Sequence, residues 1–308
     1  MHSYLRAIGF SESHLTEYDL GLLLDDVYRY YDHMESVLLD GTGRAFLELG
    51  RSYGTGIGLK VCGELDGRGF HRQYYYPYVS AFEPTSDGHV TVERRVNGES
   101  YAGVVDDGRV GMSLIFHVQN PGDYMREEHL GRLGVFGIKA SLVGLSTGGA
   151  VLLPVCAPKD EDEIRERASF FEERTNVMAQ AKSGEAEAIQ NLTLQDMSLY
   201  SMLNRRIETE DVFSIVETTF MPHGLESDVY KIIGIIRRAD KVRNTYTGEE
   251  LWRLAIESNG IPLDISINET DLLGEPETGR RFEGTIWLQG RLNFGNAVEV
   301  VPDLPSGA

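Results

Sequence analysis

Short turn-forming pairs divide the first half of the chain into apolar segments of strand length. Asp66-Gly67 separates residues 58–65 from residues 70–79, while Asn97-Gly98 and Asp107-Gly108 bound the next such segments. Asn-Gly and Asp-Gly favour type I′ turns, because both central residues of that turn adopt positive φ angles. We therefore expect a mostly antiparallel meander of about six or seven strands in this half of the chain.

Apolar residues at helical spacing precede the meander. Thr16 is followed three residues later by Asp19, which resembles a capping box at a helix start. Gly41 and Gly43 follow the last apolar residue and favour a helix end there. We therefore expect one amphipathic helix over residues 16–39 that covers one face of the sheet. Its apolar stripe is Leu20, Leu23, Leu24, Val27, Tyr31, Met34 and Leu38.

The segment from residue 140 to residue 158 carries no charge and contains several glycines. Thr147-Gly148 predicts a further hairpin turn within it. Ser146 sits in a G-x-S-x-G match to the serine-hydrolase motif, but that motif needs a following helix, whereas a strand-like run ending at Pro154 follows. A membrane-spanning helix needs about 20 mostly apolar residues. We therefore interpret the segment as two strands joined by a turn.

The second half of the chain changes character twice. Residues 159–206 have helical spacing and many acidic side chains, and we expect an acidic helical connector there. Residues 207–294 return to β-branched runs, with Asn259-Gly260 as a turn, and predict a small five-strand antiparallel module that is OB-like at best. Residues 295–308 form a tail.

These segments together predict an α+β fold of two sheet regions and a connector. The first region, residues 1–158, would be a helix-covered antiparallel sheet with the helix at its N-terminal end. The connector and the small β module would follow it.

Composition argues against several function classes. With 29 basic and 48 acidic side chains, the net charge is −19, which disfavours nucleic acid and anionic membranes as partners. Cys62 and Cys156 cannot form a disulfide framework, and we interpret them as free buried thiols. The eight histidines are scattered, so we expect neither a metal site nor a cofactor. The first residues lack a basic region followed by an apolar run, which predicts a cytoplasmic protein.

Two places in the sequence are candidate partner surfaces. Successive side chains in a strand face opposite sides, so a run of tyrosines would place one or two outward, where tyrosines favour recognition. Packing under the neighbouring helix is the other interpretation of that run. The second place is the loop of residues 275–280. The candidate residues are Tyr74, Tyr75, Tyr76 and Tyr78 in the run, and Glu275 and Arg280 in the loop.

Several short sequence segments are characteristic when they are taken together. They resemble an uncharacterised bacterial family, domain of unknown function 3881, over nearly the whole chain. The resemblance implies a cytoplasmic bacterial protein and brings no activity, ligand or site residue. The segments are residues 2–10, 192–197, 210–216, 220–224 and 274–279, and the last is followed by a further segment at 286–291.

The leading functional hypothesis is a non-catalytic cytoplasmic binding or scaffold protein that binds a protein or a small molecule. One alternative is an enzyme whose site is assembled from distant residues. Another is weak binding of single-stranded nucleic acid by the C-terminal module, because basic and aromatic residues occur there together. Those residues are Arg237, Arg238, Lys241, Arg243, Trp252 and Trp287.

Overall fold

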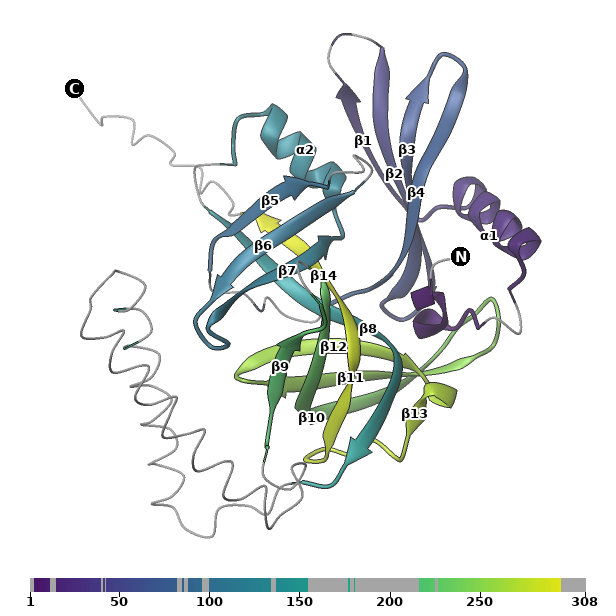
Figure 1. Ribbon diagram of the computed structural model, residues 1–308. Helices are drawn as coiled ribbons and strands as arrows, with labels where there is room; N and C mark the ends of the chain where they lie inside the picture. The colour runs from purple at the N-terminus through teal and green to yellow at the C-terminus, as the bar shows by residue number, and fades with distance from the viewer. Residues whose placement is uncertain are drawn as a thin grey trace, which may run out of the picture.

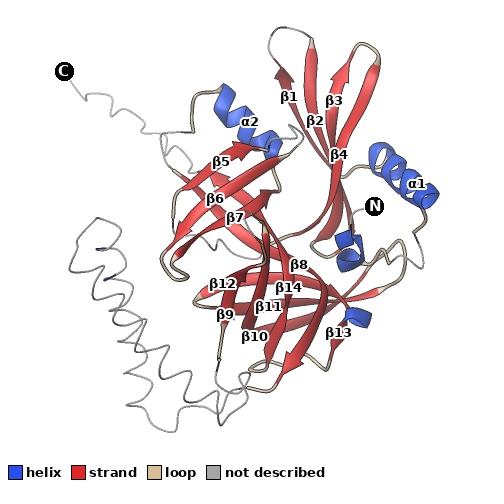
Figure 2. Ribbon diagram, in the orientation of Figure 1, coloured by secondary structure: helices blue, strands red, loops and turns tan. Residues whose placement is uncertain are grey.

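The computed structural model describes two stretches of the chain, residues 3–154 and 216–294, together with residues 177 and 180. Short gaps lie at residues 12–14, 40, 42, 82–84, 86–87, 96–99, 134–136 and 225–226. The predicted connector and tail therefore fall outside the described residues, apart from residues 177 and 180. Strands dominate the described part, as Figure 2 shows, and only short helical segments accompany them.

Four antiparallel strands form the smaller sheet, in the order of the chain. They are β1 (His33–Leu39), β2 (Arg44–Gly54), β3 (Ile57–Asp66) and β4 (Gly69–Val79). The turn predicted at residues 66–67 lies between β3 and β4, so that prediction is confirmed.

Helix α1 (Glu17–Arg29) packs on one face of this sheet (Figure 1). The predicted capping box is confirmed, because the Thr16 side chain accepts from the backbone of Asp19 while the Asp19 carboxylate accepts from the backbone of Thr16. Three apolar side chains of the helix are buried against the sheet, as the helical periodicity requires. They are Leu23, Leu24 and Val27.

The prediction that this helix continues to residue 39 is wrong, because β1 occupies residues 33–39. Met34 and Leu38 are four residues apart, a spacing that fits both a helix face and one face of a strand. In the structure they lie on one face of β1 and pair with Leu49 and Ala45 of β2. The strand forms because its backbone completes hydrogen bonds with β2 along its whole length.

The larger sheet has ten strands. Four come from the N-terminal stretch, β5 (Val90–Arg94), β6 (Tyr101–Asp107), β7 (Met112–Val118) and β8 (Ile138–Leu152), and the short β9 (Thr219–Pro222) begins the C-terminal stretch. The rest are β10 (Val229–Arg243), β11 (Glu250–Ser258), β12 (Ile261–Asn268), β13 (Leu272–Leu273) and β14 (Arg281–Phe294). Short helical segments are η1 (Ser3–Ile8), α2 (Pro121–His129) and η2 (Glu269–Asp271).

Five of these strands close into a ring, in the order β8, β12, β11, β10, β14 and back to β8. The β8–β12 pair is parallel and the other pairs are antiparallel. The predicted α+β class is therefore wrong: the described chain is mostly β, and a strand from the first predicted region completes the C-terminal module. Strand pairing between distant segments leaves no local mark in a sequence, which is why turn counting missed it. The division into domains stays a prediction.

The predicted hairpin at residues 147–148 is also wrong, because β8 runs through it. The glycines serve close packing instead of a turn. A Cβ atom on Gly144 would lie 2.9 Å from the Ile286 side chain, and one on Gly149 would lie 2.5 Å from the Phe282 ring. By contrast, the predicted turn at Asn259 and Gly260 is confirmed, with φ angles of 50° and 76° that suit a type I′ turn.

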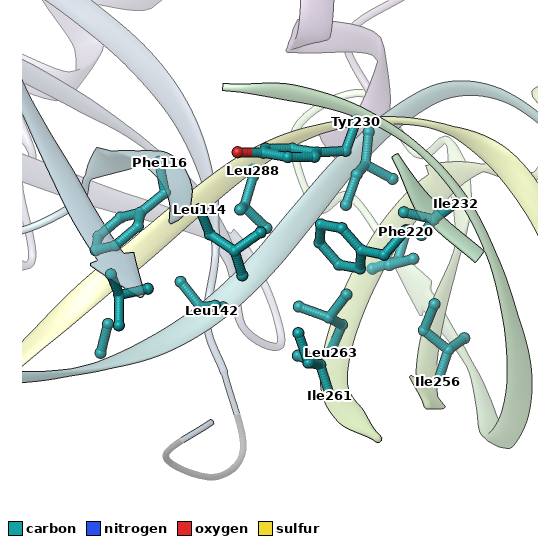
Figure 3. Packing of buried hydrophobic residues seen from close by; sticks show 14 of the residues in the cluster. Leu114, Phe116, Leu142, Phe220, Tyr230, Ile232, Ile256, Ile261, Leu263 and Leu288 are labelled. Atoms are coloured by element: carbon teal, nitrogen blue, oxygen red, sulfur yellow. The ribbon is translucent and has the colours of Figure 1, made fainter. Parts of the chain in front are cut away.

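Two apolar cores hold the molecule together. The first fills the ring and extends under β5–β7, with Phe220, Tyr230 and Leu263 among its members (Figure 3). The second lies between the smaller sheet, α1, η1 and the outside of the ring, where Leu145 and Trp287 contribute. The smaller sheet is therefore docked on the ring through apolar contacts.

The N-terminal segment is fixed to the ring by hydrogen bonds to its backbone. Three consecutive carbonyls accept from side chains of β12 and of the turn between β10 and β11, at 2.7 Å each, which satisfies polar groups that the segment buries. The pairs are Ser266 with Ala7, Asn244 with Ile8, and Thr247 with Gly9. Residues 7–9, which belong to one of the segments that resemble the family, thus have a structural role. No helix within the described residues is long and apolar enough to span a membrane.

Candidate functional site

The predicted tyrosine run lies on β4 and is mostly packed. Tyr76 is 1% exposed, and its hydroxyl donates to the Gln119 carbonyl at 2.8 Å. Tyr74 and Tyr78 are half-buried and pair with β3 residues on the same face, while Tyr75 is half-buried on the other face. These contacts follow the packing interpretation, and a recognition role for the tyrosines stays a prediction.

A buried ion pair lies beside this run. Lys60 of β3 pairs with Glu48 of β2, and its Nζ also donates to the Gln119 carbonyl at 2.6 Å. The other Glu48 oxygen accepts from the backbone N–H of Gly122 at 3.0 Å, in the first turn of α2. A carboxylate is favourable at that position because N–H groups at a helix start are free to donate. The sequence signal for this pair is a lysine inside an apolar strand.

Two glutamine side chains join the sheets. Gln289 of β14 donates to the Pro77 carbonyl at 2.8 Å, and Gln119 donates to the Val79 carbonyl at 2.9 Å. The two amides also bond each other at 2.7 Å. These contacts cover backbone carbonyls of β4, so they stabilise the junction of the two sheets.

Aromatic rings surround His117 at the same junction. Its ring centroid lies 4.5 Å from that of Tyr76 and 5.0 Å from that of Trp287. The Trp287 indole donates to Asp228 at 2.7 Å, and Asp228 also pairs with Arg95. His117 is buried, so a substrate could not reach it without opening the junction. The arrangement resembles a structural core more than an acid–base site.

The nucleophile candidates are also buried. The Ser146 hydroxyl lies 2.9 Å from the backbone carbonyls of both Gly148 and Thr285, which fixes it inside the ring wall. Burial raises the pKa of the Cys62 thiol, so it remains protonated and a poor nucleophile. Within the described residues, no group of three or more His, Cys, Asp or Glu side chains could hold a metal ion.

The four basic residues of the predicted nucleic-acid surface each pair with a neighbouring carboxylate. Lys241 also lies over the Trp252 ring, 4.9 Å from its centroid, while Trp287 is buried elsewhere on β14. Single-strand binding needs a continuous positive groove with exposed rings, which these pairs do not provide. The pairs are Arg237 with Glu257, Arg238 with Asp240, Lys241 with Glu269, and Arg243 with Glu250.

The second predicted surface, the loop before β14, is folded on itself. Arg280 donates to the Glu275 carbonyl at 3.2 Å and pairs with Glu277 at 2.9 Å. The loop lies at the start of β14, whereas the tyrosine run lies on the smaller sheet (Figure 1). The structure therefore does not bring the two predicted surfaces together, and a partner role for the loop stays a prediction.

Exposed apolar side chains gather in one region of the molecule. Of thirteen large apolar side chains that are exposed in the described part, eight lie on α1, the turn after it, β1 and the end of β3. The other five are scattered, which is ordinary for a protein surface. The eight are Tyr18, Leu22, Tyr28, Tyr30, Tyr31, Met34, Leu38 and Leu65.

Part of this group forms a continuous row across the smaller sheet. Leu38, Ala45, Leu65 and Phe70 pair in register from β1 to β4. The Tyr28 ring of α1 stacks on Phe70, with centroids 5.4 Å apart. We use the name α1–β1 apolar surface for five residues: Tyr28, Met34, Leu38, Leu65 and Phe70. Sequence reasoning missed it because β1 was predicted to be helical.

The comparison with known families agrees with the resemblance in the sequence. A family model described as "Domain of unknown function, E. rectale Gene description (DUF3881)" matches residues 5–290. The chain belongs to this family. The DUF3881 match includes the α1–β1 apolar surface and reaches Gly290 of β14, so the closed ring lies almost entirely within it. No curated protein and no solved structure matches the chain.

Proposed function

We propose that this member of the DUF3881 family is a non-catalytic binding protein that holds a protein partner on the α1–β1 apolar surface. The observation that supports the proposal is the number of exposed apolar side chains there: four of the thirteen belong to this surface, and four more lie on α1 and the turn after it. Contiguous exposed apolar area on a folded protein marks interaction sites, whereas single exposed residues do not. The buried Lys60–Glu48 pair and the two glutamines of the junction, by contrast, bond one another and nearby backbone groups and stabilise the fold.

The experiment compares two double variants of the tagged full chain in a pull-down from the native cell. Met34→Ser with Leu38→Ser removes the apolar side chains of β1. Leu153→Ser with Leu273→Ser is the matched control, because Leu38 and Leu273 are 73% and 74% exposed but lie in different regions. We expect a near-stoichiometric protein that the control retains and the β1 variant loses. Equal retention by both variants would contradict the proposal.

We also propose that the protein acts in the cytoplasm. Free, buried Cys62 is compatible with a reducing compartment, where thiols are kept reduced. Fractionation of the native cell tests this, and recovery in the soluble cytoplasmic fraction is the expected outcome.

A further inference from the structure

The edges of the two sheets are protected unequally. Natural sheets block their edges with proline, charge, short strands or covering groups, because an open edge pairs readily with another strand. Gln289 and Gln119 cover carbonyls of β4. Strand β5 carries exposed Glu93 and Arg94, and β13 has two residues.

Strand β1 is less protected: helix α2 contacts it at Glu35, on the face opposite Met34 and Leu38, and no described strand pairs with its outer side. It is the outer strand of the smaller sheet and, among the described strands, pairs with β2 alone. It contains neither proline nor lysine, and its one carboxylate, Glu35, pairs with Arg126 of α2. Met34 and Leu38 project from it on the face that carries α1 and are exposed. This edge is therefore both apolar and close to neutral.

The pattern of β1 is symmetric about Ser36. If two copies of β1 pair antiparallel with Ser36 opposite Ser36, Met34 lies opposite Leu38 of the second copy, and Leu38 lies opposite its Met34. Glu35 then faces Val37 and never a second glutamate. Opposite side chains in an antiparallel pair lie on the same face, about 4.5–5.5 Å apart between their Cβ atoms. The contact between Met34 and Leu38 therefore occurs twice, and it covers both exposed apolar residues of each copy.

We infer that β1 pairs with β1 of a second copy of this chain, centred on Ser36, and joins the two smaller sheets into one. This inference rests on the proposed binding role of the α1–β1 apolar surface and names its partner. The interface is isologous, as in most homodimers. Repulsion between two chains of net charge −19 is screened beyond roughly 8–10 Å at physiological salt, so added salt strengthens the pairing.

The test uses cysteines placed along β1 in the full chain with Cys156→Ser. Opposite residues of an antiparallel pair have Cα atoms about 4.5–5.5 Å apart, within the range that a disulfide spans. We expect Ser36→Cys to give a disulfide-linked dimer on mild oxidation, and Thr91→Cys, exposed on the edge strand β5, to stay monomeric. A mixture of Met34→Cys and Leu38→Cys chains should crosslink, while either chain alone should not.

Light scattering gives the mass without any crosslink. We expect the wild-type chain at twice 34.4 kDa, Leu38→Glu at half that mass, and Leu273→Glu unchanged from wild type. A one-chain mass for wild type, or equal crosslinking of Ser36→Cys and Thr91→Cys, overturns the inference. The wild-type chain could instead be monomeric and capture a different protein in the pull-down, which the variant Met34→Ser with Leu38→Ser fails to capture. In that case the second-copy inference fails and the proposed function stands.

Discussion

Lys60 and Glu48 form a buried ion pair where the smaller sheet meets the start of helix α2. Both side chains are almost fully covered, and each has a further backbone partner, Gln119 for the lysine and Gly122 for the glutamate. Buried charges are tolerated in such places only when they are paired and hydrogen-bonded. The pair therefore ties α2 and the strand end before it to the sheet.

Removing one charge of this pair should be costly. Lys60→Met leaves Glu48 buried without its cation, and we expect the free energy of unfolding to fall by roughly 3–5 kcal/mol. The double variant Lys60→Met with Glu48→Met should be more stable than Lys60→Met alone, because no unpaired charge remains. Urea denaturation followed by tryptophan fluorescence measures both, and a loss below about 1 kcal/mol for Lys60→Met would contradict the prediction.

Gln289→Leu should loosen the junction between the sheets. The substitution removes two hydrogen bonds and leaves the Pro77 carbonyl and the Gln119 amide without this partner, at about 1–3 kcal/mol for each buried group. Hydrogen exchange of β4 amides should accelerate with it. Gln73→Leu, on the exposed part of β4, is the control and should change the free energy of unfolding by about 0.5 kcal/mol or less.

The N-cap of α1 offers a smaller, local change. Thr16→Ala removes the hydroxyl that accepts from the Asp19 backbone at 3.2 Å, and we expect about 1 kcal/mol of destabilisation. Thr16→Ser keeps the oxygen and should remain close to wild type. Thermal unfolding followed by circular dichroism separates the two, and equal melting temperatures for both variants would show that the cap carries little stability.

Alkaline pH should unfold the protein through its covered tyrosines. Burial, with a smaller contribution from Asp32, raises the pKa of Tyr78 from 10.0 to about 12, against a lowering effect of Arg291. A raised folded-state pKa gives stability that is complete below the unfolded value and is lost as pH rises through the folded value. Stability should therefore fall between about pH 10 and pH 12. Denaturation midpoints across this range measure it, and Tyr78→Phe should flatten the slope.

The local signals in the sequence were read correctly where one chemical requirement decided the structure. Positive φ angles select Asn259 and Gly260 for their turn, and a hydroxyl at Thr16 begins the helix. Such features depend on a few neighbouring residues, so spacing alone reveals them. The tyrosine run is visibly unusual in the sequence, but the burial of its side chains depends on which strands surround β4.

The errors arose where distant contacts decided between local alternatives. The spacing of Met34 and Leu38 suits a helix as well as a strand, and only pairing with β2 settles it. Gly144 and Gly149 resemble turn residues, yet they admit Ile286 and Phe282 from β14. The exposed apolar surface does not follow from an interpretation of residues 33–39 as helix. It depends on the pairing of β1 with β2, which places Leu38 beside Ala45 on one face of the sheet.

The pairing of β8 with β14 also bears on how the chain folds as it is synthesised. Leu152 pairs with Arg281 and Ile138 with Phe294, so β8 cannot complete its pairing in the ring until β14 has left the ribosome. Until then β8 exposes backbone groups and apolar side chains that its partner will cover. Contacts between distant segments slow folding and prolong the exposure of unpaired strands. Until β14 has been synthesised, a nascent chain of this protein therefore presents an unpaired strand of the kind that chaperones bind.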